Sequence, residues 1–132
     1  MPADLEVLVL DDEPTVCERL KDFLQKDGMK VETFTESTAA VERLADKRFH
    51  VVVTDLKMKG PTGIDVLVAV KKQKLPTQVI VITGYRTMDA TRAAECVGAY
   101  GFLDKPFHME ELRDLVRKAG KRAEKEAPAA RT

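Results

Sequence analysis

The chain has 132 residues, 44% of them hydrophobic, which suits one domain with a single packed core and argues against disorder. Its 22 basic and 22 acidic residues give no net charge at pH 7, so we expect no direct binding of nucleic acid. No apolar run approaches the length of a membrane span and no signal-peptide pattern opens the chain, so we expect a cytoplasmic protein without membrane contact.

Strands and helices are predicted to alternate from the N-terminus onward. A first strand, 5–10, precedes a helix that starts at Pro14, since proline suits a first helical turn. Gly28 is expected to end this helix in a left-handed conformation. Residues 30–34 alternate polar and apolar side chains, as an edge strand does, and Ser37 is expected to cap the second helix.

The same alternation continues through the middle of the chain. A buried strand at 50–54 is followed by a loop rich in Lys, Gly and Pro, and then by a third helix that begins near Ile64 and stops before Pro76. Residues 78–82 form a fourth buried strand. The fourth helix, near 87–97, has an inward face made mostly of alanine, so we expect it to pack weakly and to move.

The end of the chain completes the fold. A short fifth strand lies at about 100–103, and the apolar stripe of the last helix runs from Met109 to Ala119. The domain is therefore assigned to residues 1–119, with the charged run at 120–132 as a solvated extension or linker. Five such units with right-handed crossovers predict an α/β, doubly wound five-stranded parallel sheet with five helices. The amphipathic second strand suits an edge, which favours the order 2-1-3-4-5.

Cysteines and histidines do not suggest a site. Cys17 and Cys96 stand singly within helical patterns, which is typical of buried bystanders rather than of a redox pair or a catalytic thiol. His50 and His108 have no Cys or His nearby at ligand spacing, which argues against zinc.

Four of the predicted strands end at residues that can handle a phosphoryl group or a metal: Asp11 and Asp12, Asp55, Thr83, and Lys105. The carboxyl ends of parallel strands share one edge of a sheet, so we expect these side chains to meet there. Carboxylates at close quarters repel and need a cation, and oxygen ligands without Cys or His favour Mg²⁺. A carboxylate beside a metal and a lysine is suited to attack phosphorus.

Four motifs also carry a resemblance to a known family. They are Val-Leu-Asp-Asp-Glu at 9–13, Val-Thr-Asp-Leu-Lys-Met at 53–58, Val-Ile-Thr-Gly-Tyr at 81–85 and Phe-Leu-Asp-Lys-Pro-Phe at 102–107. Over about residues 5–119 the chain resembles the receiver domain of two-component response regulators. The resemblance implies a flavodoxin-like fold and a phosphoacceptor in a phosphorelay rather than an enzyme. The stretch that ends with the fourth motif is similar to receivers of nitrogen-regulation-type transcriptional activators.

By position, the resemblance assigns roles to the residues at the strand ends. Asp55 matches the aspartate that accepts a phosphoryl group from a histidine kinase or a phosphotransfer protein. Asp11 and Asp12 match the acidic pair that holds Mg²⁺ together with Asp55, and Asp12 is the more direct ligand. Lys105 matches the lysine that contacts the phosphoryl group, and the bond that follows this residue is commonly cis in the family.

Further positions match parts of the switch and of the phosphate entrance. Lys57 lies where the family supplies a backbone carbonyl to the metal. Thr83 matches the switch hydroxyl, and Phe102 occupies the aromatic switch position, where tyrosine is common. Gly84 matches the small residue that leaves the site open. Lys57 and Tyr85 flank the phosphoryl group, and a bulky Tyr85 is expected to shield it from water.

The resemblance also implies an output. Phosphorylation should draw Thr83 toward Asp55, make room for Phe102 and shift the surface of the fourth helix, fifth strand and fifth helix. Candidate partners at that surface are a second copy of the chain and a C-terminal output domain. The family often has proline four residues after the phosphorylated aspartate, where this chain has Lys59, so the shape of that loop is not fixed by the resemblance.

Three other functions are alternatives to a phosphorylated receiver. A degenerate receiver would act as a phosphate-independent interaction module. A phosphatase of the haloacid-dehalogenase type needs a second acid two residues after the nucleophile, where this chain has Lys57. A flavodoxin-like cofactor binder needs a Gly/Ser/Thr-rich phosphate loop after the first strand, where Asp11, Asp12 and Glu13 would repel a phosphate.

Overall fold

The computed structural model describes residues 5–55, 63–72, 76–84 and 98–126. The expected helix at 87–97 lies outside these ranges. Within them, no helix is long and apolar enough to cross a bilayer. The elements in chain order are β1 (Glu6–Leu10), α1 (Pro14–Lys26), β2 (Lys30–Phe34), α2 (Ser37–Asp46), β3 (Val51–Asp55), α3 (Gly63–Lys72), β4 (Gln78–Thr83), β5 (Gly101–Asp104) and α5 (Met109–Glu126).

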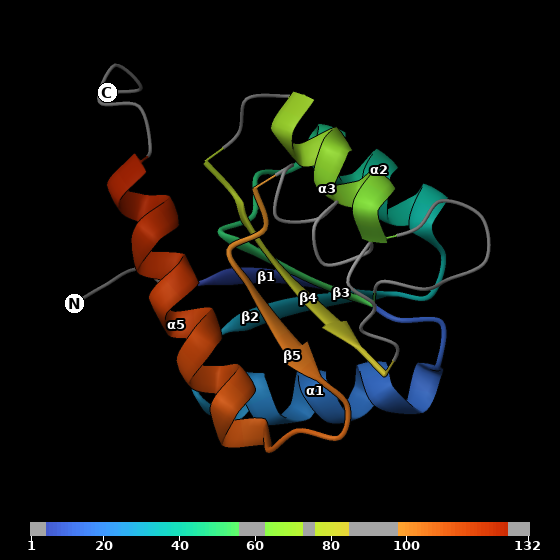
Figure 1. The fold of residues 1–132 in the computed structure, drawn as a ribbon, viewed down its shortest axis with the longest axis vertical. Coiled ribbons are helices and arrows are strands. Elements are labelled where there is room, and N and C mark those ends of the chain that lie inside the picture. Colours follow the sequence, from blue (N-terminus) through green and yellow to red (C-terminus); the bar gives the residue numbers. More distant parts are fainter. Residues whose placement is uncertain (1–4, 56–62, 73–75, 85–97, 127–132) are drawn as a thin grey trace.

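The five strands form one parallel sheet in the order β2-β1-β3-β4-β5, which confirms the predicted topology (Figure 1). Leu10 of β1 pairs with Thr54 of β3. Asp11 and Asp55, the residues that follow this pair, therefore lie side by side. On the other side of β3, Thr83 at the end of β4 is level with Asp104 at the end of β5. This register brings the strand ends to one edge of the sheet.

Helices cover both faces of the sheet, α1 and α5 on one side and α2 and α3 on the other (Figure 1). Along β1, β3 and β4, alternate side chains enter two separate apolar clusters, and nearly every residue of these strands is buried. Burial on both faces explains their continuous runs of Val, Ile and Leu. Each fully buried side chain of this kind contributes about 1.5–3 kcal/mol, so the central strands form a firm base for the site.

The start of the fold follows the sequence with one exception. Pro14 is the first residue of α1, and Gly28 has a φ of 88°, as expected for the residue that ends that helix. The assignment of Ser37 as the cap of α2 is wrong: Glu36 is the N-cap, with an extended φ of −126°, and Ser37 is already helical and buried. No side-chain hydrogen bond from Glu36 caps the helix. Serine is typical of an N-cap, so the sequence pattern did not show that the helix begins one residue earlier, with Glu36 as the cap.

Helix α5 does not end near Ala119 but continues to Glu126. Ala119 and Ala123, one turn apart, are both buried, and a Cβ on Gly120 would lie 2.7 Å from Leu5 Cδ1. Small residues therefore let the last turns of α5 pack closely on the start of β1, although the surrounding side chains are charged. The domain boundary drawn at residue 119 stays a prediction.

Charged side chains fasten α2 to the edge strand β2. Arg43 makes a two-pronged contact with Glu32, with Nε to Oε1 at 2.8 Å and Nη2 to Oε2 at 3.0 Å. Lys47 Nζ lies 3.0 Å from Glu32 Oε2 and 3.0 Å from Glu6 Oε1. The hydrogen bond from Arg43, with a further contribution from Lys47, lowers the pKa of the Glu32 carboxyl to about 2.

Replacing Glu32 with glutamine should therefore destabilise the protein in a pH-dependent way. A carboxyl whose pKa is lowered by folding stabilises the folded state above its ordinary pKa, and this stabilisation is lost as the pH falls through the folded-state pKa. We expect the difference in free energy of unfolding between wild type and Glu32→Gln to be constant above about pH 5. It should shrink as the pH falls from 4.5 toward 2. Urea unfolding at a series of pH values measures it.

Glu42→Gln is the matched control, since Glu42 is an exposed glutamate of α2. This control should change stability little at any pH. A difference between wild type and Glu32→Gln that does not vary with pH would contradict the role given to Glu32.

Candidate functional site

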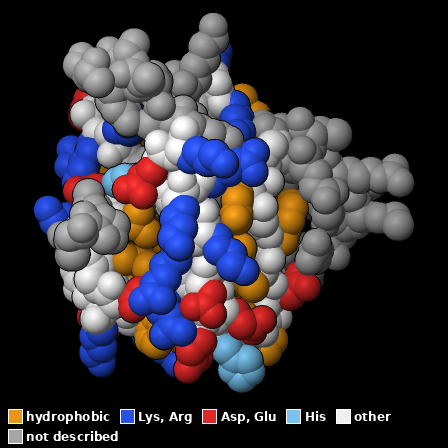
Figure 2. Space-filling view, turned by 90° about the vertical axis from the view of Figure 1, so that its left-hand side faces the viewer, with side chains coloured by type: hydrophobic (Ala, Val, Ile, Leu, Met, Phe, Trp, Pro, Cys, Tyr) orange, Lys and Arg blue, Asp and Glu red, His pale blue; other side chains and the backbone are white. Residues whose placement is uncertain are grey.

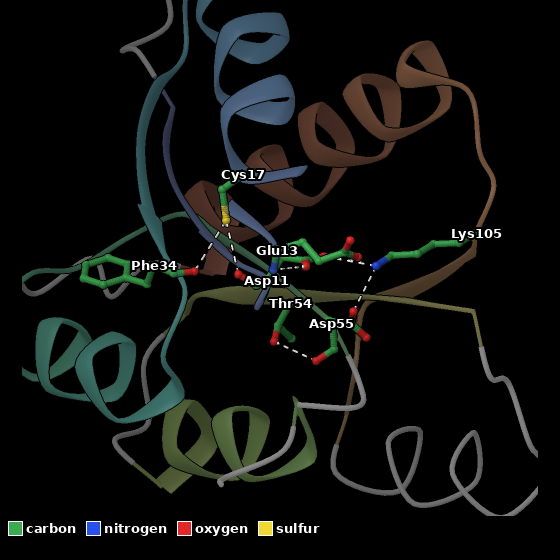
Figure 3. Close-up of polar contacts among 7 residues, drawn as sticks. All are labelled: Asp11, Glu13, Cys17, Phe34, Thr54, Asp55 and Lys105. Atoms are coloured by element: carbon green, nitrogen blue, oxygen red, sulfur yellow. Dashed lines mark hydrogen bonds and ion pairs between the residues drawn. The ribbon is translucent and has the colours of Figure 1, made fainter. Parts of the chain in front are cut away.

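Carboxylates and an ammonium meet at the carboxyl ends of β1, β3 and β5 (Figure 3). Asp11 and Asp12 follow β1, Asp55 is the last residue of β3, and Lys105 follows β5. One carboxylate oxygen from each of Asp11, Asp12 and Asp55 lies within 4.8 Å of the other two. Asp11 and Asp55 are 94 and 50 positions from Lys105 in the sequence, but both contact its side chain in the structure.

Asp11 is fully buried, and both of its carboxylate oxygens have partners. Oδ1 accepts a hydrogen bond from the backbone N–H of Glu13 at 2.9 Å, which turns the chain from β1 into α1. Oδ2 accepts one from Lys105 Nζ at 3.1 Å. These two contacts fix the direction of the Asp11 carboxylate.

Asp55 shares the same lysine. Its Oδ2 accepts a hydrogen bond from Lys105 Nζ at 2.9 Å, and the residue as a whole is 8% exposed (Figure 3). The hydroxyl of Thr54 donates to the backbone carbonyl of Asp55 at 3.0 Å. Asp55 is therefore held at both its backbone and its side chain, while its remaining exposure lies at the edge of the sheet.

Electrostatics at this edge favour added positive charge. Burial raises the pKa of the Asp11 carboxyl, and the hydrogen bonds from Glu13 and Lys105 offset this only in part. Burial alone would lower the pKa of the Lys105 ammonium, but its hydrogen bonds to Asp55 and Asp11 outweigh burial and raise it. Lys105 is therefore protonated. Its single positive charge contacts the carboxylates of Asp11 and Asp55, and the carboxylate of Asp12 lies beside them.

The residues present fit a divalent cation. Three carboxylates from Asp11, Asp12 and Asp55 converge, one of them exposed, and among the described residues no histidine or cysteine belongs to the cluster. Oxygen ligands of this kind suit a hard ion such as Mg²⁺. The backbone carbonyl of Lys57, expected as a further ligand, lies outside the described residues.

Thr83, the last residue of β4, and Gly84, the residue after it, lie next to Lys105. Thr83 is 1% exposed, and its carbonyl accepts a hydrogen bond from the backbone N–H of Lys105 at 2.8 Å. The Lys105–Pro106 peptide bond is cis, as the resemblance implied. A Cβ on Gly84 would lie 4.0 Å from Lys105 Cβ, so a small residue here keeps the lysine stem uncrowded.

Phe102 is half-buried on the face of the sheet covered by α2 and α3. Phe102 pairs with Val81 of the neighbouring strand β4, and both side chains belong to the same apolar cluster. Thr83 lies two residues after Val81 on β4. Side chains two apart on a strand point to the same face. Thr83 and Phe102 are thus neighbours on one face. Lys59 and Tyr85 lie outside the described residues.

Two contacts at the site were not anticipated from the sequence. One is the hydrogen bond from the backbone N–H of Glu13 to the Asp11 carboxylate. An aspartate often accepts such a bond from the residue two positions after it, so Asp11 itself was the available signal for this turn. The other is Cys17, a predicted bystander, whose buried thiol lies 3.4 Å from the carbonyl oxygen of Asp11 and 3.5 Å from that of Phe34. Burial, followed by the charge of Asp11, raises the pKa of this thiol, which keeps it protonated and unreactive.

Comparison with known sequences agrees with this geometry. A sequence model described as the response regulator receiver domain matches residues 7–117. The transcriptional regulatory protein FixJ of Bradyrhizobium diazoefficiens is 31% identical over 126 residues, which cover 96% of this chain and 60% of FixJ. The DNA-binding transcriptional regulator NtrC of Escherichia coli is 32% identical over 113 residues, which cover 86% of this chain and 24% of NtrC. The chain thus spans less than two thirds of either relative.

Solved structures show the same fold. A response regulator receiver domain protein from Clostridium thermocellum aligns with a TM-score of 0.85 and 32% identity, covering 91% of this chain and 97% of that one. The receiver domain in the beryllofluoride-activated NtrC4 dimer aligns with a TM-score of 0.82 and 31% identity, covering 88% of this chain and 96% of that one.

The carboxylate cluster leads to a prediction about metal binding. Mg²⁺ should raise the Tm of the protein, because a ligand bound by the folded state alone stabilises that state. Asp12→Asn removes the exposed carboxylate of the cluster and should weaken Mg²⁺ affinity by about tenfold or more. Asp12→Asn should have little effect on the Tm measured without metal, because Asp12 is exposed. Calorimetric titration with Mg²⁺ and thermal unfolding measure the two effects.

Glu13→Gln is the control for Asp12→Asn. Glu13 is the exposed acidic neighbour, but its carboxylate is not part of the three-carboxylate cluster. Equal Mg²⁺ affinities for wild type, Asp12→Asn and Glu13→Gln would exclude the cluster as the metal site.

Proposed function

Since this chain belongs to the response regulator receiver domain family of two-component signalling, we propose that Asp55 accepts a phosphoryl group from a histidine kinase or phosphotransfer protein. The proposal includes Mg²⁺, held by the carboxylates of Asp11, Asp12 and Asp55 and by the backbone carbonyl of Lys57. Receiver domains act as signalling switches rather than as enzymes on other substrates, and we propose the same for this chain.

One observation carries the proposal. Lys105 Nζ lies between Asp55 Oδ2 at 2.9 Å and Asp11 Oδ2 at 3.1 Å, at the edge of the sheet where Asp55 is 8% exposed. A lysine with a purely structural role would need only one carboxylate partner. A buried ion pair also adds little stability to a protein compared with apolar residues in its place. A cation aimed at a partly accessible nucleophile, with a third carboxylate within 4.8 Å, is instead suited to bind incoming anionic oxygens.

In the proposed transfer, a carboxylate oxygen of Asp55 forms a bond to phosphorus as the phosphorus–nitrogen bond of a phosphohistidine breaks. The imidazole leaves with the electron pair of that bond and takes up a proton. Lys105 exchanges its contact with Asp55 for one with a phosphoryl oxygen, where its ammonium offsets negative charge. Mg²⁺, when bound, neutralises further charge on the phosphoryl oxygens. The backbone hydrogen bond from Glu13 keeps the Asp11 carboxylate directed at the site throughout.

The proposed switch couples Thr83 to Phe102. A phosphoryl group on Asp55 offers the Thr83 hydroxyl a charged acceptor, which draws the side chain toward the site. The space that it leaves lies on the face of the sheet where Phe102 packs, so the ring can move inward. Phe102 has no hydroxyl, so packing alone decides between its inward and outward positions.

The surface that responds is proposed to be the fourth helix together with β5 and α5. Of these, the described residues include β5 and α5. FixJ and NtrC are named as transcriptional regulators and are longer than the part that matches here. We therefore propose that this receiver controls transcription through an output domain, a second copy or another partner that contacts this surface.

Phosphorylation is the direct test of Asp55. Incubation with acetyl phosphate and Mg²⁺ should add one phosphoryl group to the wild-type protein, seen by intact-protein mass spectrometry. Asp55→Asn should remain unmodified, because an amide is not a nucleophile toward phosphorus. Asp22→Asn, a change of the same kind at an exposed position of α1, should be modified like wild type.

Modification of Asp55→Asn at the wild-type rate would show that another residue is the acceptor. A wild-type protein that binds Mg²⁺ but is never modified would favour the phosphate-independent interaction module.

The switch can be tested apart from the chemistry. With Mg²⁺ and beryllofluoride, the ring signals of Phe102 should shift in NMR spectra of the wild type and of Thr83→Ser, which keeps the hydroxyl. In Thr83→Ala the ring signals should stay near their positions without beryllofluoride, because no hydroxyl moves to open the space. The same shift in all three proteins would separate Phe102 from Thr83 and refute the coupling.

A further inference from the structure

His50 joins the start of the sheet to the last turns of α5. Its backbone N–H donates to the carbonyl of Glu6 at 2.9 Å, and the backbone N–H of Glu6 donates to His50 Nδ1 at 3.0 Å. The other ring nitrogen, Nε2, lies 3.8 Å from Glu124 Oε2. His50 precedes β3, whereas Asp55 is the last residue of that strand. One imidazole thus contacts both β1 and α5 at the end of the sheet opposite to the carboxylate cluster.

The contact with Glu6 fixes where the imidazole carries its proton. A backbone N–H can only donate, so Nδ1 accepts and holds no proton while this contact exists. The neutral ring then carries its proton on Nε2, which faces Glu124. A separation of 3.8 Å is too long for a hydrogen bond, so the second contact is weak while the ring is neutral.

A second proton on His50 would reverse the balance between these two contacts. It can enter only at Nδ1, where it would face the N–H of Glu6 and deprive that group of its acceptor. The ring would also become a cation beside the carboxylate of Glu124, which makes an ion pair possible. Imidazole side chains change their charge between about pH 5 and pH 8, so this exchange falls within a range that cells experience.

Charged groups on the sheet side of His50 are already paired or solvated. The carboxylate of Glu6 contacts Lys47, from the turn after α2, with Oε1 to Nζ at 3.0 Å. Arg48, the next residue, is exposed. From β4, the backbone N–H of Gln78 donates to the carbonyl of His50 at 3.0 Å and adds no charge. None of these groups offers a free carboxylate to a protonated ring.

On the helix side, Glu124 is an acid within a basic region. Lys and Arg side chains cover the middle and upper part of the face in Figure 2, while acidic ones gather toward its lower end. Lys121 and Lys125 are the exposed bases three residues before and one residue after Glu124. These ammonium groups oppose a charge on His50, so the contact with Glu124 is what favours its protonated form.

Both contacts of His50 act on one tightly packed junction. A Cβ on Gly120 would lie 2.7 Å from Leu5 Cδ1, and Ala123 is buried one turn before the end of α5. Leu5 precedes Glu6, the residue whose N–H the imidazole accepts. The residue that His50 holds on β1 is therefore next to the one on which α5 packs.

We propose that His50 is a pH-responsive junction between β1 and α5. When neutral it is bound to the N–H of Glu6, and when protonated it exchanges this contact for an ion pair with Glu124. Acid then loosens the first residue of β1 and ties the end of α5 to the start of β3. The exchange needs neither Mg²⁺ nor a phosphoryl group, so it goes beyond the proposed function and gives α5 an input independent of Asp55.

NMR spectroscopy of the wild-type protein without Mg²⁺ tests the junction between about pH 5 and pH 8. At the upper end, the nitrogen shifts of the His50 ring should place its proton on Nε2. Toward the lower end, the protection of the Glu6 N–H against hydrogen exchange should fall by about fivefold, relative to an unstructured chain at the same pH. The N–H of Tyr100, which donates to the carbonyl of Val79, should keep its protection.

His50→Asn separates the effect of the proton from that of the side chain. Asparagine offers its Oδ1 as an acceptor for the Glu6 N–H, and this oxygen takes up no proton in the same pH range. In this variant the protection of the Glu6 N–H should not vary with pH. Thermal unfolding confirms that the variant is folded, and the wild-type measurements decide the proposal if it is not.

Glu124→Gln tests the contact with α5. Loss of the carboxylate should lower the pH at which the His50 ring signals move by about 0.2–0.5 of a pH unit, because a partly exposed ion pair is weak. Glu110→Gln, the same change in the first turn of α5, should leave that pH as in wild type.

Three results would each overturn the junction. The first is a wild-type ring with its proton on Nδ1 at the upper end of the pH range. The second is protection of the Glu6 N–H that does not change with pH in wild type, or that changes equally in a folded His50→Asn. The third is a set of identical titration curves for His50 in wild type, Glu124→Gln and Glu110→Gln.

Discussion

Two buried carboxylates placed side by side are the constraint around which this protein is arranged. Like charges about 4 Å apart at an effective dielectric near 20 repel by roughly 4 kcal/mol. Asp11 and Asp55 occupy adjacent strand ends and have almost no exposure. Lys105 relieves this repulsion by donating to both, at 3.1 and 2.9 Å. The remaining excess of negative charge, increased by Asp12, is what makes the edge of the sheet receptive to a metal ion.

The fold supplies this arrangement because the three strand ends are fixed by buried elements. β1 and β3 are covered on both faces, and their register sets Asp11 beside Asp55 before any side chain contributes. Lys105 is anchored by its backbone N–H to the carbonyl of Thr83, so the position of the ammonium depends on the end of β4. In the proposed switch, a change of partner at Lys105 is linked through this backbone contact to Thr83 and, across the same face of the sheet, to Phe102. The proposed path from Asp55 to the surface therefore lies within two adjacent strands, β4 and β5.

The sequence predicted the sheet well because its signals are strong and local. Unbroken apolar runs marked the buried strands, alternation in β2 marked the edge, and polar residues at the strand ends marked the site. Predictions were wrong or incomplete where the signal was weak. Ser37 is the residue type that usually caps a helix, so nothing in the sequence pointed to Glu36 as the cap. Ala119, Gly120 and Ala123 carry too little hydrophobicity to show that α5 continues among charged residues. The contact of the Cys17 thiol with the carbonyl of Asp11 depends on tertiary placement, which no local pattern encodes.

The most direct test of the central role of Lys105 is a crystal structure of the protein with Mg²⁺ and beryllofluoride. The account predicts beryllofluoride attached to the Asp55 carboxylate, Lys105 Nζ in contact with a fluorine atom instead of Asp55, and the metal bound by Asp11, Asp12 and Asp55. It is contradicted if Lys105 keeps its contact with the Asp55 carboxylate while beryllofluoride is bound, or if the metal lies away from these three residues.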